Sequence, residues 1–202
     1  MSIRAFLFDI GNVLLKFDFS KALRAVAAES DVENEIEALG LIDRIKVAYE
    51  DGQIDRASFL RGVFDVLKFR GTEAAFINAW EDIFEPNEPM VALVEKLGPR
   101  FPLSLLSNTN DIHREYFLKR WDFFRHFRGG TYSDVARFSK PGREIYQIAC
   151  LEQSLEPSST FFIDDLLPNI ETARALGFQT HHYHHERHDE LLKAIAAAGV
   201  EM

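Results

Sequence analysis

The sequence predicts an α/β protein: a doubly wound parallel sheet that carries an inserted helical unit. Short apolar runs alternate with helical patterns over residues 90–202, as they do where crossover helices join parallel strands. A further apolar run, residues 3–8, stands alone near the N-terminus. Residues 20–84 show the spacing of buried helices almost throughout. These three observations place the first strand and the later strands in one sheet, with the helical segment inserted between them.

Each element of the predicted sheet follows from a local pattern. The first strand ends at Asp9, where Ile10-Gly11-Asn12 breaks the apolar run into a loop. Three later apolar runs predict strands at residues 103–106, 160–163 and 178–183. A glycine-containing run, residues 129–133, predicts a short strand or turn. Helical spacing predicts the helices between them, at residues 90–97, 112–120, 143–151, 170–176 and 190–198.

The segment between the first strand and this alternation is the predicted insertion. Asp55 and Thr72 stand where N-cap residues are expected before its last two helices. Two prolines punctuate residues 85–89, which we interpret as a hinge back to the sheet. We therefore expect a core made of residues 1–15 and 90–202, with a helical insertion over residues 16–89.

Composition limits the classes of function. The chain has 202 residues, 47% of them hydrophobic, which suits one modest α/β domain with a buried core. Its formal net charge of −9 argues against a basic nucleic-acid-binding face. No secretory signal and no apolar run of about 20 residues is visible, so we expect a cytoplasmic protein with no membrane partner. Cys150 is the only cysteine, which excludes an internal disulfide and fits a packed helix position.

Acidic residues follow two of the predicted strands. In open parallel sheets, ligands bind beyond the carboxyl ends of the strands. Asp9 follows the first strand, where a carboxylate can act as a nucleophile in phosphoryl transfer or as a ligand of a hard cation. Asp164 and Asp165 follow another strand, and adjacent carboxylates favour a cation beside them. Together they predict a Mg²⁺ site, whereas each group taken alone also fits a helix or turn cap.

Polar and basic groups complete the predicted site. Ser107 and Asn108 follow a third strand and can offer a hydroxyl, an amide and backbone N–H groups to phosphate oxygens. Lys140 lies in a loop just before a helix and would place a positive charge against a phosphate and Asp9. Turn chemistry and a solvated surface lysine are the alternatives for these residues. The expected partner is thus a small phosphorylated substrate.

Four ordered segments resemble the motifs of the haloacid dehalogenase (HAD) superfamily. They are Phe8-Asp9-Ile10-Gly11-Asn12-Val13, Leu106-Ser107-Asn108-Thr109, Lys140-Pro141, and Ile163-Asp164-Asp165 with Asn169. The resemblance spans essentially the whole chain. It implies a Rossmann-like core, and the insertion resembles the family's helical C1 cap. The first motif is similar to that of bacterial α-D-glucose-1-phosphate phosphatases.

The resemblance implies a reaction and a role for the matching residues. The chain would be a phosphoric monoester hydrolase that forms an aspartyl-phosphate on Asp9. Ser107 and Asn108 would bind the transferring phosphoryl group. Lys140 would neutralise that group and orient the nucleophile.

The same resemblance implies a ligand set for Mg²⁺. Asp9 and Asp165 would bind the ion directly and Asp164 through water, with Asn169 behind them. Gly11 would contribute its backbone carbonyl. The helical cap would close over the cleft and read the rest of the substrate, and Tyr49 and Glu50 are candidates for this task by position.

One position departs from the pattern. Most phosphatases of the superfamily have a second Asp two places after the nucleophile as general acid and base, whereas this chain has Gly11. Loss of proton donation to the leaving group typically costs about 10²–10⁴-fold in rate. A leaving group that needs little protonation, as in a sugar 1-phosphate or an acyl phosphate, would accommodate this loss. Alternatively, Asn12 or Asp18 would organise a proton-relaying water.

Two other functions stay open on the sequence alone. A 2-haloacid dehalogenase-type hydrolase also uses an Asp nucleophile and lacks the second Asp, but it needs no magnesium and lacks the Asp164-Asp165 pair. A non-catalytic HAD-like binding protein would explain Gly11 as a mark of lost activity.

A histidine-rich stretch holds His181, His182, His184, His185 and His188. We interpret it as an exposed strand end and loop rather than a metal site. Nothing in the sequence predicts the oligomeric state.

Overall fold

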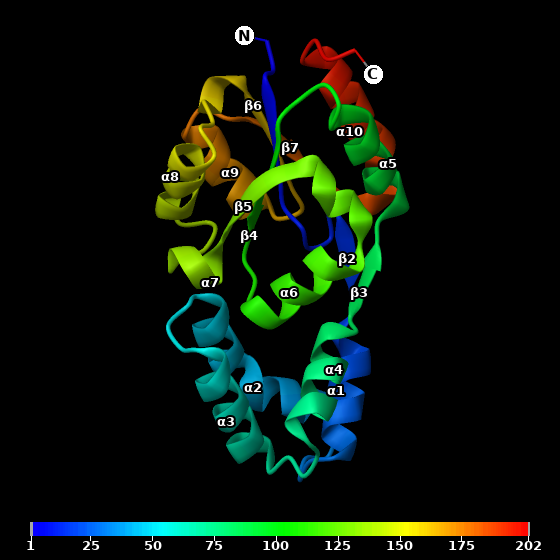
Figure 1. Cartoon of the computed structure of the whole chain (residues 1–202), viewed down its shortest axis with the longest axis vertical. Coiled ribbons are helices and arrows are strands. Elements are labelled where there is room, and N and C mark those ends of the chain that lie inside the picture. Colours follow the sequence, from blue (N-terminus) through cyan, green and yellow to red (C-terminus); the bar gives the residue numbers. More distant parts are fainter. Residues whose placement is uncertain (1, 202) are drawn as a thin grey trace.

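The computed structural model describes residues 2–201 and shows a five-stranded parallel sheet in the upper body of the molecule (Figure 1). The strand order is β5-β4-β1-β6-β7, and each neighbouring pair is parallel. The strands are β1 (Ala5–Phe8), β4 (Leu103–Ser107), β5 (Phe127–Tyr132), β6 (Thr160–Asp164) and β7 (Gln179–His182). The predicted doubly wound parallel sheet is therefore confirmed, and the glycine-containing run is a strand rather than a turn.

The register of the central strands brings their carboxyl ends to one edge. Phe8 is paired with Leu105 of β4 and with Ile163 of β6. Every residue of β1, β4 and β6 is buried, because helices cover both faces of a parallel sheet. Asp9, directly after β1, and Asp164, the last residue of β6, thus end adjacent strands at the same level.

Helices cover both faces of this sheet. They are α5 (Glu88–Leu97), α6 (Asp111–Arg120), α7 (Ser133–Ala136), α8 (Arg143–Glu152), α9 (Leu167–Ala175) and α10 (His188–Ala197). Phe6 and Phe8 of β1 share an apolar cluster with α5 and α10, while Ala5 and Leu7 point to the opposite face and share one with α8 and α9. The single turn α7 has no counterpart among the predicted elements.

The lower body in Figure 1 consists of four helices that share a core of their own. They are α1 (Phe19–Ala28), α2 (Glu35–Glu50), α3 (Arg56–Leu67) and α4 (Glu73–Glu81). Phe59, Phe76 and Trp80 are fully buried at its centre, and Ile112 of α6 also belongs to this cluster. The predicted N-caps are confirmed, since the side chains of Asp55 and Thr72 accept hydrogen bonds from backbone N–H groups of α3 and α4.

Two short antiparallel strands connect the bodies. They are β2 (Leu15–Phe17) and β3 (Phe84–Pro86), with Phe17 opposite Phe84. The segment predicted as a hinge at residues 85–89 is instead divided between β3 and the first turn of α5, where Pro89 occupies an early position. A three-residue strand is too short to show a period, so the sequence predicted neither strand.

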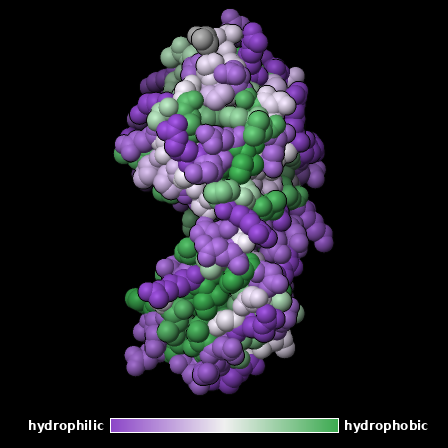
Figure 2. All heavy atoms as spheres, turned by 90° about the vertical axis from the view of Figure 1, so that its left-hand side faces the viewer, coloured by the Kyte–Doolittle hydropathy of each residue, from purple (hydrophilic) through white to green (hydrophobic). Residues whose placement is uncertain are grey.

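A side view shows the two bodies as separate lobes joined at a waist (Figure 2). The polypeptide passes between them through the ribbon of β2 and β3, and the bodies also touch where α2 contacts α7 and where α4 contacts α6. Among residues 2–201, no helix combines the length and apolar character that crossing a bilayer requires.

Candidate active site

Asp9 stands in the first turn after the central strand. Its backbone N–H donates to the Ile163 carbonyl at 2.9 Å, which extends the pairing of β1 and β6 by one residue. The side chain accepts from the Ile10 N–H at 2.7 Å and is only 7% exposed. A carboxylate that has lost most of its water needs other partners, and the neighbouring strand ends supply them.

Lys140 is the buried cation of the site. Its ammonium lies 2.8 Å from Asp9 Oδ1 and 2.7 Å from Asp164 Oδ2, and it donates to the Leu106 carbonyl at 3.0 Å. The side chain is 1% exposed, so it is a bridge between strand ends and not a solvated surface lysine. Burial opposes its charge, but the carboxylates of Asp9 and Asp164 prevail and raise the pKa of Lys140.

The adjacent aspartates after β6 have different surroundings. Asp164 is fully buried and also accepts from the Leu166 N–H at 2.8 Å and from Asn169 Nδ2 at 2.9 Å. Asp165 is partly exposed and accepts from Asn12 Nδ2 at 3.1 Å. Asp164 has donors on both oxygens, which leaves Asp165 the more open of the two toward a ligand.

The three carboxyl groups fit a divalent metal ion. One oxygen from each of Asp9, Asp164 and Asp165 lies within 4.8 Å of the others. Three carboxylates and one ammonium leave two formal negative charges in a buried place. Burial therefore raises the pKa of Asp9 to about 7, Lys140 opposes this shift, and the charges of Asp164 and Asp165 add to it. All-oxygen, acidic ligands are those that Mg²⁺ prefers.

Ser107 and Asn108 reach the same edge, but in different ways. Ser107 ends β4 and lines a cavity at this edge together with Ile10 and Gly11. Asn108 Nδ2 donates to the Lys140 carbonyl at 2.9 Å, and the Lys140 N–H donates to Asn108 Oδ1 at 2.8 Å. The Asn108 amide thus holds the loop of Lys140 in place, with both of its polar atoms engaged.

A cavity of 190 Å³ lies between the sheet edge and the helical insertion. Gly11, Ser107 and Asn108 line it from the core. Lys46 and Glu50 line it from α2 and form an ion pair at 2.9 Å, with side chains 19% and 20% exposed. Glu50 was predicted by position, whereas Lys46 was missed; its place one helical turn before Glu50 was the available signal.

Tyr49, the other candidate from the insertion, has a structural place instead. Its ring is stacked on Phe59 inside the aromatic core of the insertion, with 4.4 Å between centroids. Its hydroxyl donates to Asp111 at the start of α6, which also binds Arg56 at 2.9 Å. Tyr49 therefore ties the two bodies together and is not among the residues that line the cavity.

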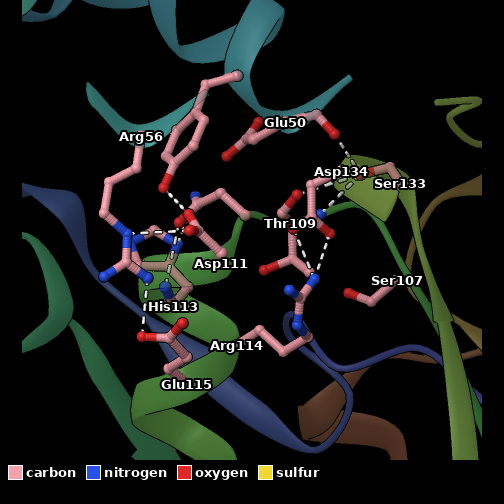
Figure 3. Close-up of polar contacts among 12 residues, drawn as sticks. Glu50, Arg56, Ser107, Thr109, Asp111, His113, Arg114, Glu115, Ser133 and Asp134 are labelled. Atoms are coloured by element: carbon pink, nitrogen blue, oxygen red, sulfur yellow. Dashed lines mark hydrogen bonds and ion pairs between the residues drawn. The ribbon is translucent and has the colours of Figure 1, made fainter. Parts of the chain in front are cut away.

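Further polar contacts join the insertion to the core (Figure 3). The Ser133 hydroxyl donates to the Glu50 carbonyl at 2.5 Å and accepts from the Thr109 N–H at 3.0 Å. Ser139, next to Lys140, donates to Asp51. The end of α2 is thereby tied to both loops that carry predicted phosphate-binding residues.

His113 of α6 belongs to this junction and was not predicted. Its Nε2 lies 3.0 Å from the Trp80 carbonyl, its Nδ1 lies 3.1 Å from Asn110 Nδ2, and its ring is stacked on Trp80. Burial lowers the pKa of His113 to about 3, so the ring is neutral at ordinary pH. The neutral ring donates to the carbonyl of α4 and accepts from Asn110.

The remaining candidate residues have other roles in the structure. Asp18 caps α1, where it accepts from the Ser20 N–H at 2.8 Å, and Asn12 is engaged with Asp165. In the part of the chain that the structure describes, none of the five histidines near β7 joins a group of potential metal ligands. His182 instead contacts the Asp165 carbonyl at 2.8 Å. Cys150 is partly buried in α8 and unpaired.

Comparison with known families agrees with this architecture. The model of the haloacid dehalogenase-like hydrolases matches residues 3–177. The chain therefore belongs to this family of hydrolases. The prediction of the superfamily from four motifs is confirmed, and the motif residues Asp9, Ser107, Lys140 and Asp164 converge at the sheet edge.

Individual proteins resemble the chain at low sequence identity. A D-ribitol-5-phosphate phosphatase from Bacteroides thetaiotaomicron is 26% identical over 195 residues, which cover 88% of this chain and 90% of that protein. A crystal structure of a HAD family enzyme from the same organism, in complex with magnesium and inorganic phosphate, is 27% identical with a TM-score of 0.79 and covers 89% of this chain and 93% of its own. The named relative is thus not an α-D-glucose-1-phosphate phosphatase.

A dehalogenase shares the fold as well. The L-2-haloacid dehalogenase from Xanthobacter autotrophicus is 15% identical, covers 88% of this chain and 76% of its own, and has a TM-score of 0.64. At this identity the likeness concerns the fold alone.

Proposed function

We propose that the chain is a magnesium-dependent phosphatase that forms an aspartyl-phosphate on Asp9. One observation carries this proposal: three carboxylates from two strand ends converge within 4.8 Å, with the buried ammonium of Lys140 bound to two of them. The relative that was solved with magnesium and inorganic phosphate supports the same reading. A non-catalytic binding protein would have no evident reason to keep this costly cluster of buried charges.

Asp9, Asp165 and the Gly11 carbonyl would hold Mg²⁺, with Asp164 reaching it through water. When bound, the ion offsets the two surplus negative charges and withdraws charge from the phosphate oxygens. Lys140 holds Asp9 Oδ1, which leaves the other carboxylate oxygen to attack phosphorus. Ser107 and the backbone N–H groups that follow it would bind the transferred group, since the Asn108 amide is engaged with the lysine loop.

The substrate that we propose is the phosphate ester of a small polyol or sugar. The D-ribitol-5-phosphate phosphatase supports an alditol phosphate, and a sugar 1-phosphate is the second candidate because Gly11 provides no acid at its position. Residues 16–89 would act as a cap, with residues 1–15 and 90–202 as the catalytic core. A cap that closes over the cleft excludes water and reads the alcohol part of the substrate.

A screen of phosphorylated metabolites tests the function. We expect turnover of polyol or sugar phosphates with Mg²⁺, none with EDTA, and an acid-stable phosphoenzyme that is absent in Asp9→Asn. Turnover that Asp9→Asn retains would contradict the nucleophile. Release of halide from a 2-haloacid in the presence of EDTA would instead support the dehalogenase alternative.

A further inference from the structure

The position two residues after Asp9 provides no acid, and a neighbour crowds it. A Cβ atom placed on Gly11 would lie 3.1 Å from Cε1 of Phe17. The ring of Phe17 thus stands where a side chain of residue 11 would begin. An alcohol is a poor leaving group unless its oxygen is protonated as the P–O bond breaks, so another acid would have to serve the proposed reaction.

One carboxylic acid lines the cavity above the sheet edge. Among the described residues that line it, Glu50 is the only Asp or Glu, and it faces the cavity together with Gly11, Ser107 and Asn108. Because Glu50 comes from α2 of the insertion and Asp9 follows β1 of the core, we infer that Glu50 reaches a bound phosphate from the side away from Asp9. The leaving oxygen of an in-line displacement lies on that side, away from the nucleophile.

The backbone of Glu50 is fixed relative to the phosphate-binding loop. The Ser133 hydroxyl donates to the Glu50 carbonyl at 2.5 Å and also accepts from the Thr109 N–H at 3.0 Å (Figure 3). One buried hydroxyl thereby links the last residue of α2 to the segment after β4. This link holds Glu50 at the cavity while the insertion is closed over the core.

Building on the proposed phosphatase function, we propose that Glu50 is the general acid and base of this enzyme, supplied by the insertion in place of residue 11. In the first step, the bond from an Asp9 oxygen to phosphorus forms and the bond from phosphorus to the alcohol oxygen breaks. The electron pair of the broken bond stays on the alcohol oxygen, which takes the proton of Glu50. In the second step, a water attacks phosphorus, gives a proton to Glu50 and releases Asp9. Both carboxyl groups are then restored.

The surroundings of Glu50 suit an acid that alternates between two states. Burial raises the pKa of Glu50, the ammonium of Lys46 opposes this shift, and the charges of Asp51, directly after the helix, and of Asp43 on it add to the shift. Across the junction, His113 is neutral and Asp134 is paired with Arg114 at 2.5 Å. Lys46, at 2.9 Å, can stabilise the carboxylate that proton transfer leaves behind.

Two substrates with different leaving groups test this assignment. Glu50→Gln keeps the size and hydrogen bonding of the side chain but has no proton to give. We expect kcat/KM for D-ribitol 5-phosphate to fall by about 10²–10⁴-fold, the usual contribution of a general acid. For p-nitrophenyl phosphate, whose leaving group needs no proton, we expect a change of less than about 10-fold. Glu37→Gln, at an exposed position of the same helix, is the matched control.

Further readouts separate catalysis from structure. In the wild type, kcat/KM for the alkyl substrate, which reports the first step, should fall as pH rises above the pKa of Glu50, and this limb should be missing in Glu50→Gln. Formate should restore turnover of the alkyl substrate by Glu50→Ala. This second variant keeps the test valid if Glu50→Gln folds poorly.

Different failures have different meanings. Equal losses on both substrates, or no loss on either, would overturn the role of Glu50 while leaving the phosphatase intact. A wild type that hydrolyses neither these two substrates nor any sugar phosphate with Mg²⁺ would overturn the proposed function, and the assignment of Glu50 with it.

Discussion

The sheet edge and the helical insertion face one cavity, yet they are built by different means. At the sheet edge, Asp9, Lys140 and Asp164 are buried and bound to one another and to backbone groups. The insertion has an aromatic core around Trp80, and it presents to the cavity an ion pair that is about 20% exposed. The charged groups at the sheet edge are fixed by hydrogen bonds to the backbone at strand ends, so replacing one of them disturbs the sheet. Side chains on the surface of the insertion can be replaced without disturbing its aromatic core.

This difference suggests a division of labour. Buried charges cost several kcal/mol each unless they are paired, so a cluster of three is stable only while every partner is present. A helix surface next to a cavity tolerates substitution far better, because its stability comes from the opposite face. The core is therefore expected to supply the nucleophile and the metal site, and the insertion to select the substrate and, through Glu50, to supply the acid. The following experiments break or sharpen this contrast.

Lys140→Met should have the largest effect. Removing one partner of a buried ion pair costs about 3–5 kcal/mol, which lowers the melting temperature by about 6–20 °C in a chain of this size. We also expect turnover to fall by at least about 10³-fold, because Asp9 loses the group that orients it. Lys193→Met, at an exposed position of α10, is the control for calorimetry and kinetics. A melting temperature within the error of the control would show that the sheet edge is not held by this cation.

Mg²⁺ should stabilise the protein more at high pH than at low pH. The pKa of Asp9 is raised from 3.8 to about 7, so between these values the metal-free folded state binds more protons than the unfolded state. Its free energy of unfolding therefore falls as pH rises through this window, and Mg²⁺, which binds the carboxylate form, opposes the fall.

At pH 7.5 and 100 times its dissociation constant, Mg²⁺ should add about 2.7 kcal/mol, and clearly less at pH 5. Thermal unfolding with Mg²⁺, or with NaCl of equal ionic strength, measures the difference. Equal shifts at both pH values would contradict the site, and Asp165→Asn should remove the shift.

His113→Phe tests the junction between the two regions. The variant keeps an aromatic ring beside Trp80 but leaves the Trp80 carbonyl without its donor, at a cost of about 1–3 kcal/mol. Turnover should change by less than about 10-fold, since the ring lies outside the carboxylate cluster. His185→Phe, on an exposed turn, is the control in urea unfolding.

The pH dependence sharpens this test. Burial lowers the pKa of His113 from 6.5 to about 3, so the unfolded state binds more protons between these values and the wild type loses stability as pH falls. The Phe variant has no such loss. Its deficit should shrink from pH 7 to pH 4, and a constant deficit would contradict a buried neutral histidine.

Gly11→Ala should have the smallest effect. The new methyl group would crowd the Phe17 ring, which is 39% exposed and can turn away, so we expect a loss of about 1 kcal/mol, at the low end for overpacking. Phe17→Leu in the same chain should recover most of it. A double-mutant cycle by urea unfolding measures the coupling between the two positions. Additive effects would mean that the ring does not occupy this space.

Local sequence patterns predicted most of the architecture. The parallel strands and their helices lie within a few residues of their predicted ranges, and Gly177 has the positive φ of +96° expected after a helix. These features depend on burial period and backbone sterics, which a short window of sequence contains. The ribbon of β2 and β3 and the turn α7 are too short for such a signal.

The gathering of Asp9, Asp164 and Asp165 was also predictable, because parallel strands all end at one edge and these residues stand at two strand ends. Lys140 lies in a loop before a helix, and its place beside Asp9 was predicted from its charge. The direction of each side chain was not. Asn108 turns to the backbone of Lys140, Tyr49 turns into the aromatic core, and its neighbour Glu50 faces the cavity. The position of a residue relative to a strand end predicts whether it lies near the site. The direction of its side chain depends on the partners that packing brings from distant segments. That packing also created the junction at His113, for which no local pattern exists.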